Sequence, residues 1–274
     1  MNWPRVLPRQ RIALIPIAGL IKPGHSATFP GLPDFAGERT VSDALHQARR
    51  DRRITGVIVQ IDSRGGAAPS SELMWRAVRR CAQVKPTVAY VESVAASGGY
   101  FAAAGASRII AAPGALVGSI GVFSGRFDTR ALFDRLGIHR EVVLRGANAG
   151  LLEPAHRLSE RERETMAAEI AQIYEAFIAR VAEGRGRDPE EIRAVAEGRV
   201  FVAANAPDSL VDELGDLRAA LDWVCGQAGI DPLRVDLRPP AHQGILGSVG
   251  ELLHLEGALA GGPLLVWPGT VDLG

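Results

Sequence analysis

The sequence predicts an α/β fold in which a mostly parallel sheet is flanked by helices. Two consecutive units, at residues 54–83 and 87–106, each contain an apolar stretch, a corner with glycines and a helical segment. The apolar stretches at 54–61 and 87–91 have no polar alternation, which is typical of parallel strands covered on both faces. Strands and helices that alternate in this way favour parallel strands joined by helical crossovers.

The composition is that of a globular chain with a sizeable core. Of 274 residues, 47% are hydrophobic and 23% are charged, which suits one large domain or two small ones. The 31 basic and 31 acidic residues cancel, so neither nucleic acid nor an anionic membrane is indicated as a partner. The apolar stretch at 12–21, about ten residues, is too short to span a bilayer and has no signal-peptide layout. We therefore expect no membrane anchor and a cytoplasmic location.

No linker or change of composition divides the chain. We expect a flexible N-terminus at 1–10, one domain at 11–228 and a C-terminal extension at 229–274. The extension is rich in glycine and proline and has no cluster of site-like residues. We expect it to pack on the domain or at an interface.

The first part of the chain is expected to build the start of the sheet. Residues 11–19 predict a strand, and a loop rich in glycine and proline follows at 22–38, as is common near a binding face. Residues 40–50 have apolar side chains at helical spacing, so we expect a helix with Thr40 or Ser42 as its cap.

A turn is expected at 62–66, where the strand at 54–61 ends, and it contains the adjacent glycines Gly65 and Gly66. The carboxyl ends of neighbouring parallel strands face one crevice, where ligands bind in such sheets. A tight turn without function is the alternative for these glycines alone. A second such corner in the next unit favours the functional interpretation. We expect helix at 70–83 between the two.

Ser97 lies between a predicted strand at 87–91, which extends toward residue 92, and a helix expected at 100–106. Gly98 and Gly99 follow the serine directly. A helix start leaves amides unpaired and adds partial positive charge, which would stabilise an anion beside the serine. A glycine at 98 lets the chain approach a substrate carbonyl. This is the arrangement of a nucleophile and an oxyanion hole for acyl transfer. The alternative is that Ser97 caps a helix that packs through small residues.

The remaining elements continue the alternation of strands and helices. Strands are predicted at 107–112, 118–122 and 139–144, and helices at 128–136, 189–197 and 216–227. The longest helix opens with the capping box Ser159-x-x-Glu162 and ends near Gly184. It has one apolar stripe, which is typical of core or subunit interface, formed by Met166, Ile170, Ile173, Phe177 and Val181.

Neither the cysteines nor the histidines predict a metal site or a cofactor. Cys81 and Cys225 are isolated, so buried thiols are favoured over a disulfide. The histidines share no ligand spacing and have no obvious acidic partner, so we expect surface or core roles for His25, His46, His139, His156, His242 and His254. A Ser-His-Asp triad through His25 or His139 is a further alternative.

Several segments together resemble signal peptide peptidase A, a family of the ClpP/crotonase superfamily. They lie at 62–66 (DSRGG), 95–100 (AASGGY), 118–122 (GSIGV), 198–201 (GRVF) and 210–215 (LVDELG). The resemblance covers about residues 11–228. It implies repeated β-β-α units of the ClpP/crotonase type, with a mostly parallel sheet between helices.

By this resemblance the chain is a serine peptidase with a Ser/Lys dyad that cleaves hydrophobic peptides, such as remnants of signal peptides. Ser97 is then the nucleophile. The amides of Gly98 and of Gly65 or Gly66 form the oxyanion hole, and Ser119 lies beside the dyad.

This sequence departs from the family at the general base. The family has Gly-x-Tyr-Lys-Ser, an apolar pair and Glu-Pro, and here Gly146, Glu153 and Pro154 hold that register. Ala149 stands at the position of the lysine, and Asn148 at that of the tyrosine. A serine hydroxyl without a base is a weak nucleophile, so activity is expected to be impaired.

No other cation of the sequence replaces that lysine easily. The chain has two lysines, Lys22 and Lys85, and Lys85 precedes the strand that leads to Ser97, so it is expected at the far end of that strand. Arg145 is near in sequence, but a guanidinium stays protonated and cannot accept a proton.

Three explanations of Ala149 stay open. The alanine is an engineered replacement, or the chain is a peptide-binding pseudopeptidase, or a partner supplies the base. In the family the serine and the lysine can meet across a protomer boundary, which implies a homo-oligomer or a hetero-oligomer with a lysine-bearing paralogue. A crotonase-like enzyme that acts on an acyl-CoA thioester is a further alternative.

Overall fold

The structure is a computed structural model that describes residues 10–28, 33–125, 127–139, 141–153, 156–232, 235–238 and 264–266. Its strands are β1 (Gln10–Lys22), β2 (Phe35–Gly37), β3 (Ile54–Ala67), β4 (Thr87–Ala96), β5 (Arg108–Ala111), β6 (Leu116–Gly118), β7 (Val200–Val202), β8 (Glu213–Leu214), β9 (Val235–Arg238) and β10 (Leu264–Val266). Its helices are α1 (Glu38–Arg50), α2 (Ala68–Ala82), α3 (Gly98–Ala103), α4 (Arg130–Arg135), α5 (Glu160–Arg185), α6 (Pro189–Val195) and α7 (Leu217–Ala228).

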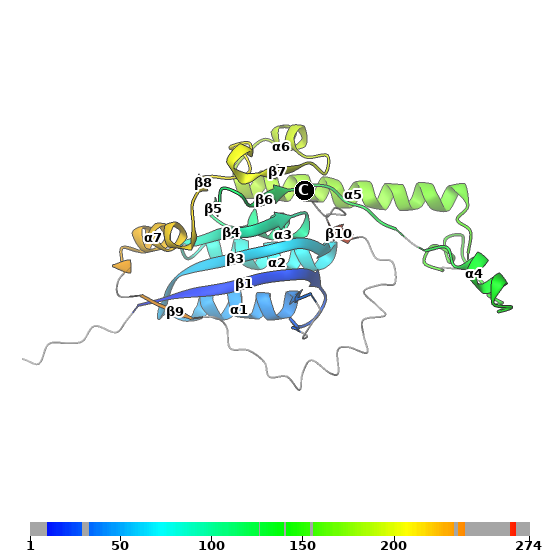
Figure 1. The fold of residues 1–274 in the computed structure, drawn as a ribbon, viewed down its shortest axis with the longest axis horizontal. Helices are drawn as coiled ribbons and strands as arrows, with labels where there is room; N and C mark the ends of the chain where they lie inside the picture. The colour runs from blue at the N-terminus through cyan, green and yellow to red at the C-terminus, as the bar shows by residue number, and fades with distance from the viewer. Residues whose placement is uncertain are drawn as a thin grey trace, which may run out of the picture.

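One mostly parallel sheet forms the centre of the molecule (Figure 1). Its main path runs β2-β1-β3-β4-β5-β8, and every neighbouring pair on this path is parallel. Off the path, β6 pairs in parallel with β4 and antiparallel with β7, β9 pairs in parallel with β1, and β10 pairs antiparallel with β3. The predicted α/β fold with a mostly parallel sheet between helices is confirmed.

Helices cover both faces of the sheet, which explains the continuous apolar strands. On one face Val59 of β3 belongs to a core shared with α1, α2, α3 and α5. On the other face its neighbour Ile58 packs in a cluster with Val224 of α7. Both side chains are fully buried, and each such burial contributes about 1.5–3 kcal/mol. Cys81 and Cys225 are free, buried thiols, as predicted.

The turn predicted at 62–66 is wrong, because β3 continues through it to Ala67. Gly65 pairs with Leu20 of β1 on one side and with Val266 of β10 on the other. With neighbours on both sides, the extended conformation keeps its ladder bonds although two glycines in a row usually signal a turn. The next strand is also longer than predicted, since β4 reaches Ala96.

Three smaller predictions about local structure are corrected. The loop expected at 22–38 contains β2, and α1 starts at Glu38 with Gly37 as its N-cap. Neither Thr40 nor Ser42 caps this helix, and Thr40 Oγ1 instead accepts a bond from the amide of Ser26.

Two predicted strands beyond α3 are also corrected. The strand expected at 118–122 is β6, which ends at Gly118 because the chain turns at Ser119 with a positive φ. The described residues of 139–144 form no strand, since no sheet neighbour satisfies their backbone groups. The capping box Ser159–Glu162 of α5 is confirmed, and the helix ends at Arg185.

The described residues of 123–159, called the arm below, leave the body of the molecule. The arm carries α4, and together with the first turns of α5 it lies beyond the end of the sheet (Figure 1). In α5, Phe177 and Val181 of the predicted stripe are buried, whereas Met166, Ile170 and Ile173 are only partly buried. The first half of α5 therefore has no complete core around it. None of the described helices is both long and apolar enough to cross a bilayer.

Candidate active site

Ser97 occupies the corner between β4 and α3 in a strained backbone conformation. Its φ is 52° and its ψ is −119°, and such a conformation costs about 1–3 kcal/mol in a residue with a side chain. The backbone is held in place because the Ser97 amide donates to Gly118 O at 2.8 Å and Phe101 N donates to Ser97 O at 2.8 Å. Ser97 does occupy the N-cap position of α3, but its side chain makes no capping hydrogen bond, so its hydroxyl does not stabilise the start of the helix.

The hydroxyl of Ser97 is buried without a partner. The residue is 1% exposed, and Oγ makes no hydrogen bond to any described residue. A buried polar atom left unpaired costs about 1–3 kcal/mol, and such atoms are rare in native proteins. A strained backbone together with an unpaired hydroxyl is typical of a position kept for function.

Ser119 stands opposite Ser97 across two paired strands. Ala96 of β4 pairs with Gly118 of β6, so each serine follows its strand at the same register. Ser119 is 5% exposed, has a φ of 51° and donates its amide to Arg199 O at 2.6 Å. The structure therefore brings the two predicted serines to one corner with the same unusual backbone.

The three predicted glycines also meet at this corner. A Cβ on Gly98 would lie 2.3 Å from Ser71 Oγ and 3.2 Å from Gly66 N, so a side chain there has no room. The Gly65 amide donates to Ser63 Oγ at 3.1 Å and is therefore already used.

β10 lies along this glycine segment. Val266 pairs with Gly65 and Leu264 with Ala67, in antiparallel orientation. β1 holds one edge of β3 as far as Gly66, whereas β4 pairs with the other edge only as far as Ser63. The strand β10 therefore takes the edge of β3 that β4 leaves open, next to the end of β4 and Ser97.

A groove of about 810 Å³ opens beside Ser119. Its walls are mostly apolar and come from the segment after β6, from the first half of α5 and from the loop before β7: Gly121, Val122, Phe123, Ala167, Ile170, Ala171, Tyr174, Glu197 and Gly198. Tyr174 Oη donates to Glu197 Oε1 at 2.7 Å. In the described part of the chain, Ser97, Ser119 and Glu197 are the non-glycine residues with positive φ, and two of them, Ser119 and Glu197, line this groove.

Ala149 is not brought to Ser97 within one chain. It is exposed on the arm, between α4 and α5, and that part of the arm lies well away from α3 (Figure 1). Two predicted site positions, Ser97 and Ala149, are therefore apart in a single copy.

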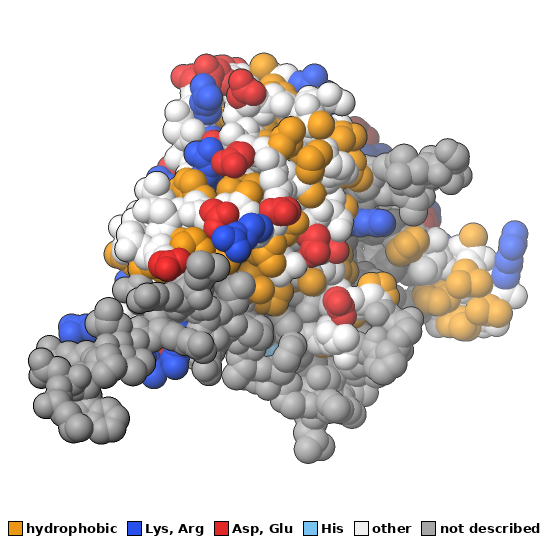
Figure 2. Space-filling view, turned by 60° about the vertical axis from the view of Figure 1, so that its left-hand side comes forward, with side chains coloured by type: hydrophobic (Ala, Val, Ile, Leu, Met, Phe, Trp, Pro, Cys, Tyr) orange, Lys and Arg blue, Asp and Glu red, His pale blue; other side chains and the backbone are white. Residues whose placement is uncertain are grey.

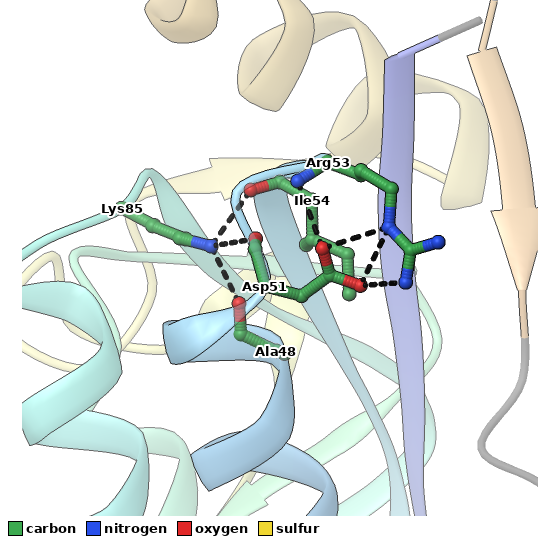
Figure 3. A network of polar contacts seen from close by, with 5 residues as sticks. All are labelled: Ala48, Asp51, Arg53, Ile54 and Lys85. Atoms are coloured by element: carbon green, nitrogen blue, oxygen red, sulfur yellow. Dashed lines mark hydrogen bonds and ion pairs between the residues drawn. The ribbon is translucent and has the colours of Figure 1, made fainter.

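Lys85 is fully engaged at the opposite end of β4 (Figure 3). Its ammonium donates to the carbonyls of Ala48, Asp51 and Ile54 at 2.5, 2.7 and 2.7 Å. The ten residues of β4 separate Lys85 from Ser97, which is roughly 30 Å at the rise of a strand. The prediction that Lys85 lies at the far end is confirmed. Lys22, in contrast, ends β1 at the same edge of the sheet as Ser97, with β3 between β1 and β4.

One histidine of the arm has an acidic partner, so the prediction that no histidine has one is wrong for His156. Its Nε2 lies 3.0 Å from Glu162 Oε2. The amide and the hydroxyl of Ser159 also donate to that oxygen, both at 2.8 Å. Bonds from the Ser159 amide, from His156 and from the Ser159 hydroxyl lower the pKa of Glu162 to about 2. In the sequence the capping box pointed to Glu162, but no pattern pointed to its contact with His156.

The residues that the structure describes include no group of three or more His, Cys, Asp or Glu side chains placed to hold a metal ion.

A model of one protein family matches more than half of the chain. The sequence profile of Peptidase family S49 matches residues 79–231. "Serine protease SPPA, chloroplastic" of Arabidopsis thaliana is 34% identical over 217 residues, which is 78% of this chain and 32% of that protein. "Protease 4" of Salmonella typhi is 32% identical over 213 residues, which is 77% of this chain and 33% of that protein. The chain thus spans about a third of the length of either relative.

One solved structure supports the fold alone. The 1510-N membrane-bound stomatin-specific protease superposes with a TM-score of 0.55 at 15% sequence identity. The match covers 86% of this chain and all of the other.

Proposed function

The chain belongs to peptidase family S49, and on that premise we propose that it is a serine peptidase with Ser97 as its nucleophile. The observation that carries the proposal is the buried, unpartnered hydroxyl of Ser97 on a strained corner. Because neither feature stabilises the fold, both are accounted for if the hydroxyl reacts with a substrate that completes the corner.

In this proposal the oxyanion is held by the amides of Gly98 and Gly66. A Cβ on Gly98 would lie 3.2 Å from Gly66 N, so the two glycines are close enough for both amides to serve one carbonyl oxygen. Ser119, at the matching register of β6, lines the site beside the nucleophile. Each oxyanion donor is worth about 2.7–4 kcal/mol of transition-state stabilisation.

The substrate class that fits best is an extended peptide with apolar side chains. The pairing of β10 with Gly65–Ala67 supports this, because it is the way in which a peptide adds a strand to an open edge. The largely apolar groove beside Ser119 offers space for a side chain of such a peptide.

The reaction is a two-step acyl transfer. A base accepts the proton of the Ser97 hydroxyl while Oγ bonds to the scissile carbonyl carbon, and the negative charge moves to the carbonyl oxygen. The carbon–nitrogen bond then breaks, and the proton goes to the leaving amine. A water molecule then attacks the acyl-enzyme in the same way, and the peptide leaves with a new carboxyl terminus. In the family the serine and its base can meet across a protomer boundary, so we propose a homo-oligomer, or a hetero-oligomer with a lysine-bearing paralogue.

A second candidate function is a peptide-binding subunit that does not cleave. The methyl group of Ala149 at the position of the family's lysine favours it. Such a subunit would bind a peptide at the same edge of β3 and in the same groove, but its Ser97 would not cleave that peptide.

A fluorogenic hydrophobic peptide tests these functions on the wild type, Ser97→Ala, Ala149→Lys and the control Ser107→Ala, whose serine is exposed outside the site. We expect turnover in the wild type that Ser97→Ala abolishes and Ser107→Ala retains. If neither the wild type nor Ala149→Lys cleaves a peptide that both bind, the chain is a binding subunit. Retention on immobilised coenzyme A instead would favour an acyl-CoA enzyme.

A further inference from the structure

A serine peptidase needs a proton acceptor, and the position where the family supplies it holds a methyl group. Ala149 cannot accept a proton, and Arg145 stays protonated at any ordinary pH. Lys85 donates to three carbonyls at the other end of β4. The base has to be found among the other titratable side chains.

The pair of His156 and Glu162 has the geometry of a general base with its orienting carboxylate. His156 Nε2 lies 3.0 and 3.2 Å from the two carboxylate oxygens of Glu162. The side chain of Glu162 is 5% exposed and that of His156 is 32% exposed. The carboxylate is therefore enclosed, while the imidazole reaches the surface of the arm. A carboxylate that fixes one ring nitrogen leaves the proton transfer to the other.

The residue after Ala149 makes room for this imidazole. A Cβ on Gly150 would lie 2.5 Å from His156 Cδ2, 2.8 Å from Nε2 and 3.0 Å from Cγ. The family has a serine at this position, and a serine here would displace the ring. The segment that lacks the lysine thus has the one residue type that allows the ring to pack against its backbone.

We propose that His156, oriented by Glu162, is the proton acceptor for Ser97 of a neighbouring copy of the chain. The inference rests on the proposed function. Because the imidazole contacts Gly150, any assembly that brings position 149 to a second Ser97 brings His156 with it. The arm lies away from α3 of its own chain, so the pairing is between copies (Figure 1).

The proton is accounted for at each step. Nε2 donates to Glu162, and Nδ1 takes the proton of the Ser97 hydroxyl as Oγ bonds to the carbonyl carbon. Any contact that Nδ1 makes within one chain is exchanged for that hydroxyl in the assembly. The imidazolium then returns the proton to the leaving amine, and the cycle repeats with water. Glu162 stays ionised and stabilises the imidazolium, while Ser159 holds the carboxylate in place.

Complementation between two inactive variants tests the proposal. As separate proteins, we expect His156→Ala to lose about 10²–10⁴-fold in kcat and Ser97→Ala to be inactive. Co-expressed in equal amounts, they should recover about a quarter of wild-type turnover, because one site in four pairs an intact Ser97 with an intact His156 from another copy. Added imidazole should partly restore His156→Ala and leave Ser97→Ala inactive.

Further variants separate the base from its surroundings. His139→Ala, which removes another exposed histidine of the arm, and Lys22→Met should keep wild-type turnover. Glu162→Gln should lower kcat with KM unchanged, as expected of a positioning residue. Ser159→Ala weakens the same helix cap but keeps the His156–Glu162 contact, and should lose far less.

The proposal is overturned if His156→Ala turns over like the wild type, if the mixed variants stay inactive, or if Lys22→Met is the inactive variant. It is also overturned if only Ala149→Lys cleaves peptide. In that case the proposed peptidase function is kept, but His156 is not its base. If no form shows turnover that depends on Ser97, the proposed function itself fails.

Discussion

Ser97 and Gly98 form a pair in which one residue is strained and the other has no space for a side chain. The serine adopts a φ of 52° between two backbone hydrogen bonds, and the glycine packs against Gly66. If the start of this helix only had to be stable, other residues could occupy both positions without backbone strain. The arrangement is explained if the two amides and the hydroxyl have to converge on one substrate carbonyl.

Gly98→Ala tests this convergence. The new methyl would lie 2.3 Å from Ser71 Oγ and 3.2 Å from Gly66 N, so we expect a loss of about 1–3 kcal/mol of stability. The urea midpoint measures this loss, and peptide turnover should fall further than stability explains. Adding Ser71→Ala removes the closest contact and should restore part of the stability without the turnover.

Gly114→Ala is the matched control, because nothing lies within 4 Å of a Cβ at that glycine. It should leave both stability and turnover near wild type. If Gly98→Ala turns over as fast as Gly114→Ala, the close approach of Gly98 has no part in catalysis.

At the scale of single elements, β10 occupies the edge of β3 where the proposed substrate would lie. Its antiparallel pairing with Gly65–Ala67 uses the same backbone groups that an added peptide strand needs. The strand should therefore compete with substrate.

Removal of residues 239–274 tests this competition. We expect a truncated chain to bind the fluorogenic peptide more tightly, with a KM about tenfold lower, which corresponds to the loss of a competing interaction of roughly 1.4 kcal/mol. Steady-state kinetics and thermal unfolding of both forms measure the effect. An unchanged KM in a truncated chain that is as stable as the full chain would show that β10 and the substrate do not share this edge.

The elements that could be predicted from sequence are those with a strong local pattern. The apolar runs identified β1, β3 and β4, and the capping box identified the start of α5. The turn predicted at 62–66 was wrong, because the two glycines are kept extended by the neighbours β1 and β10, which are far away in the sequence. The strand at 139–144 was mistaken, because alternating residues on the arm have no sheet to join.

The candidate site was predictable only in part, for the same reason. Ser97, Ser119 and the glycines are recognisable because their spacing along the chain is fixed by adjacent strands. The contact of His156 with Glu162 depends on how the chain folds back before α5, which no periodicity reports.

At the scale of the whole molecule, the arm exposes more apolar surface than a single copy explains. Of thirteen exposed large hydrophobic residues in the described chain, nine lie on the arm: Phe123, Phe127, Leu132, Leu136, Ile138, Val142, Val143, Leu144 and Leu152. Figure 2 shows hydrophobic side chains gathered on a part that stands apart from the body, at the right of the view. Such a surface is typical of a contact with another protein, and a second copy is the partner that the proposed catalysis requires.

Val143→Asp tests whether the arm holds copies together. Val143 is 92% exposed in one copy, so a charge there does not disturb the fold but opposes burial in an interface. We expect smaller species in sedimentation and a loss of turnover that higher protein concentration reverses. The control is Val84→Asp, at a valine that is 59% exposed next to Lys85, far from the arm. A wild type that is active as a single copy would contradict the role of the arm.

The identity of the nucleophile can be measured directly by labelling the wild type with a fluorophosphonate and locating the adduct by mass spectrometry. The account predicts one adduct, on Ser97, formed in step with the loss of peptide turnover and absent from Ser97→Ala. An adduct on Ser119 or another serine, or full turnover in a chain whose Ser97 is unmodified, would contradict it.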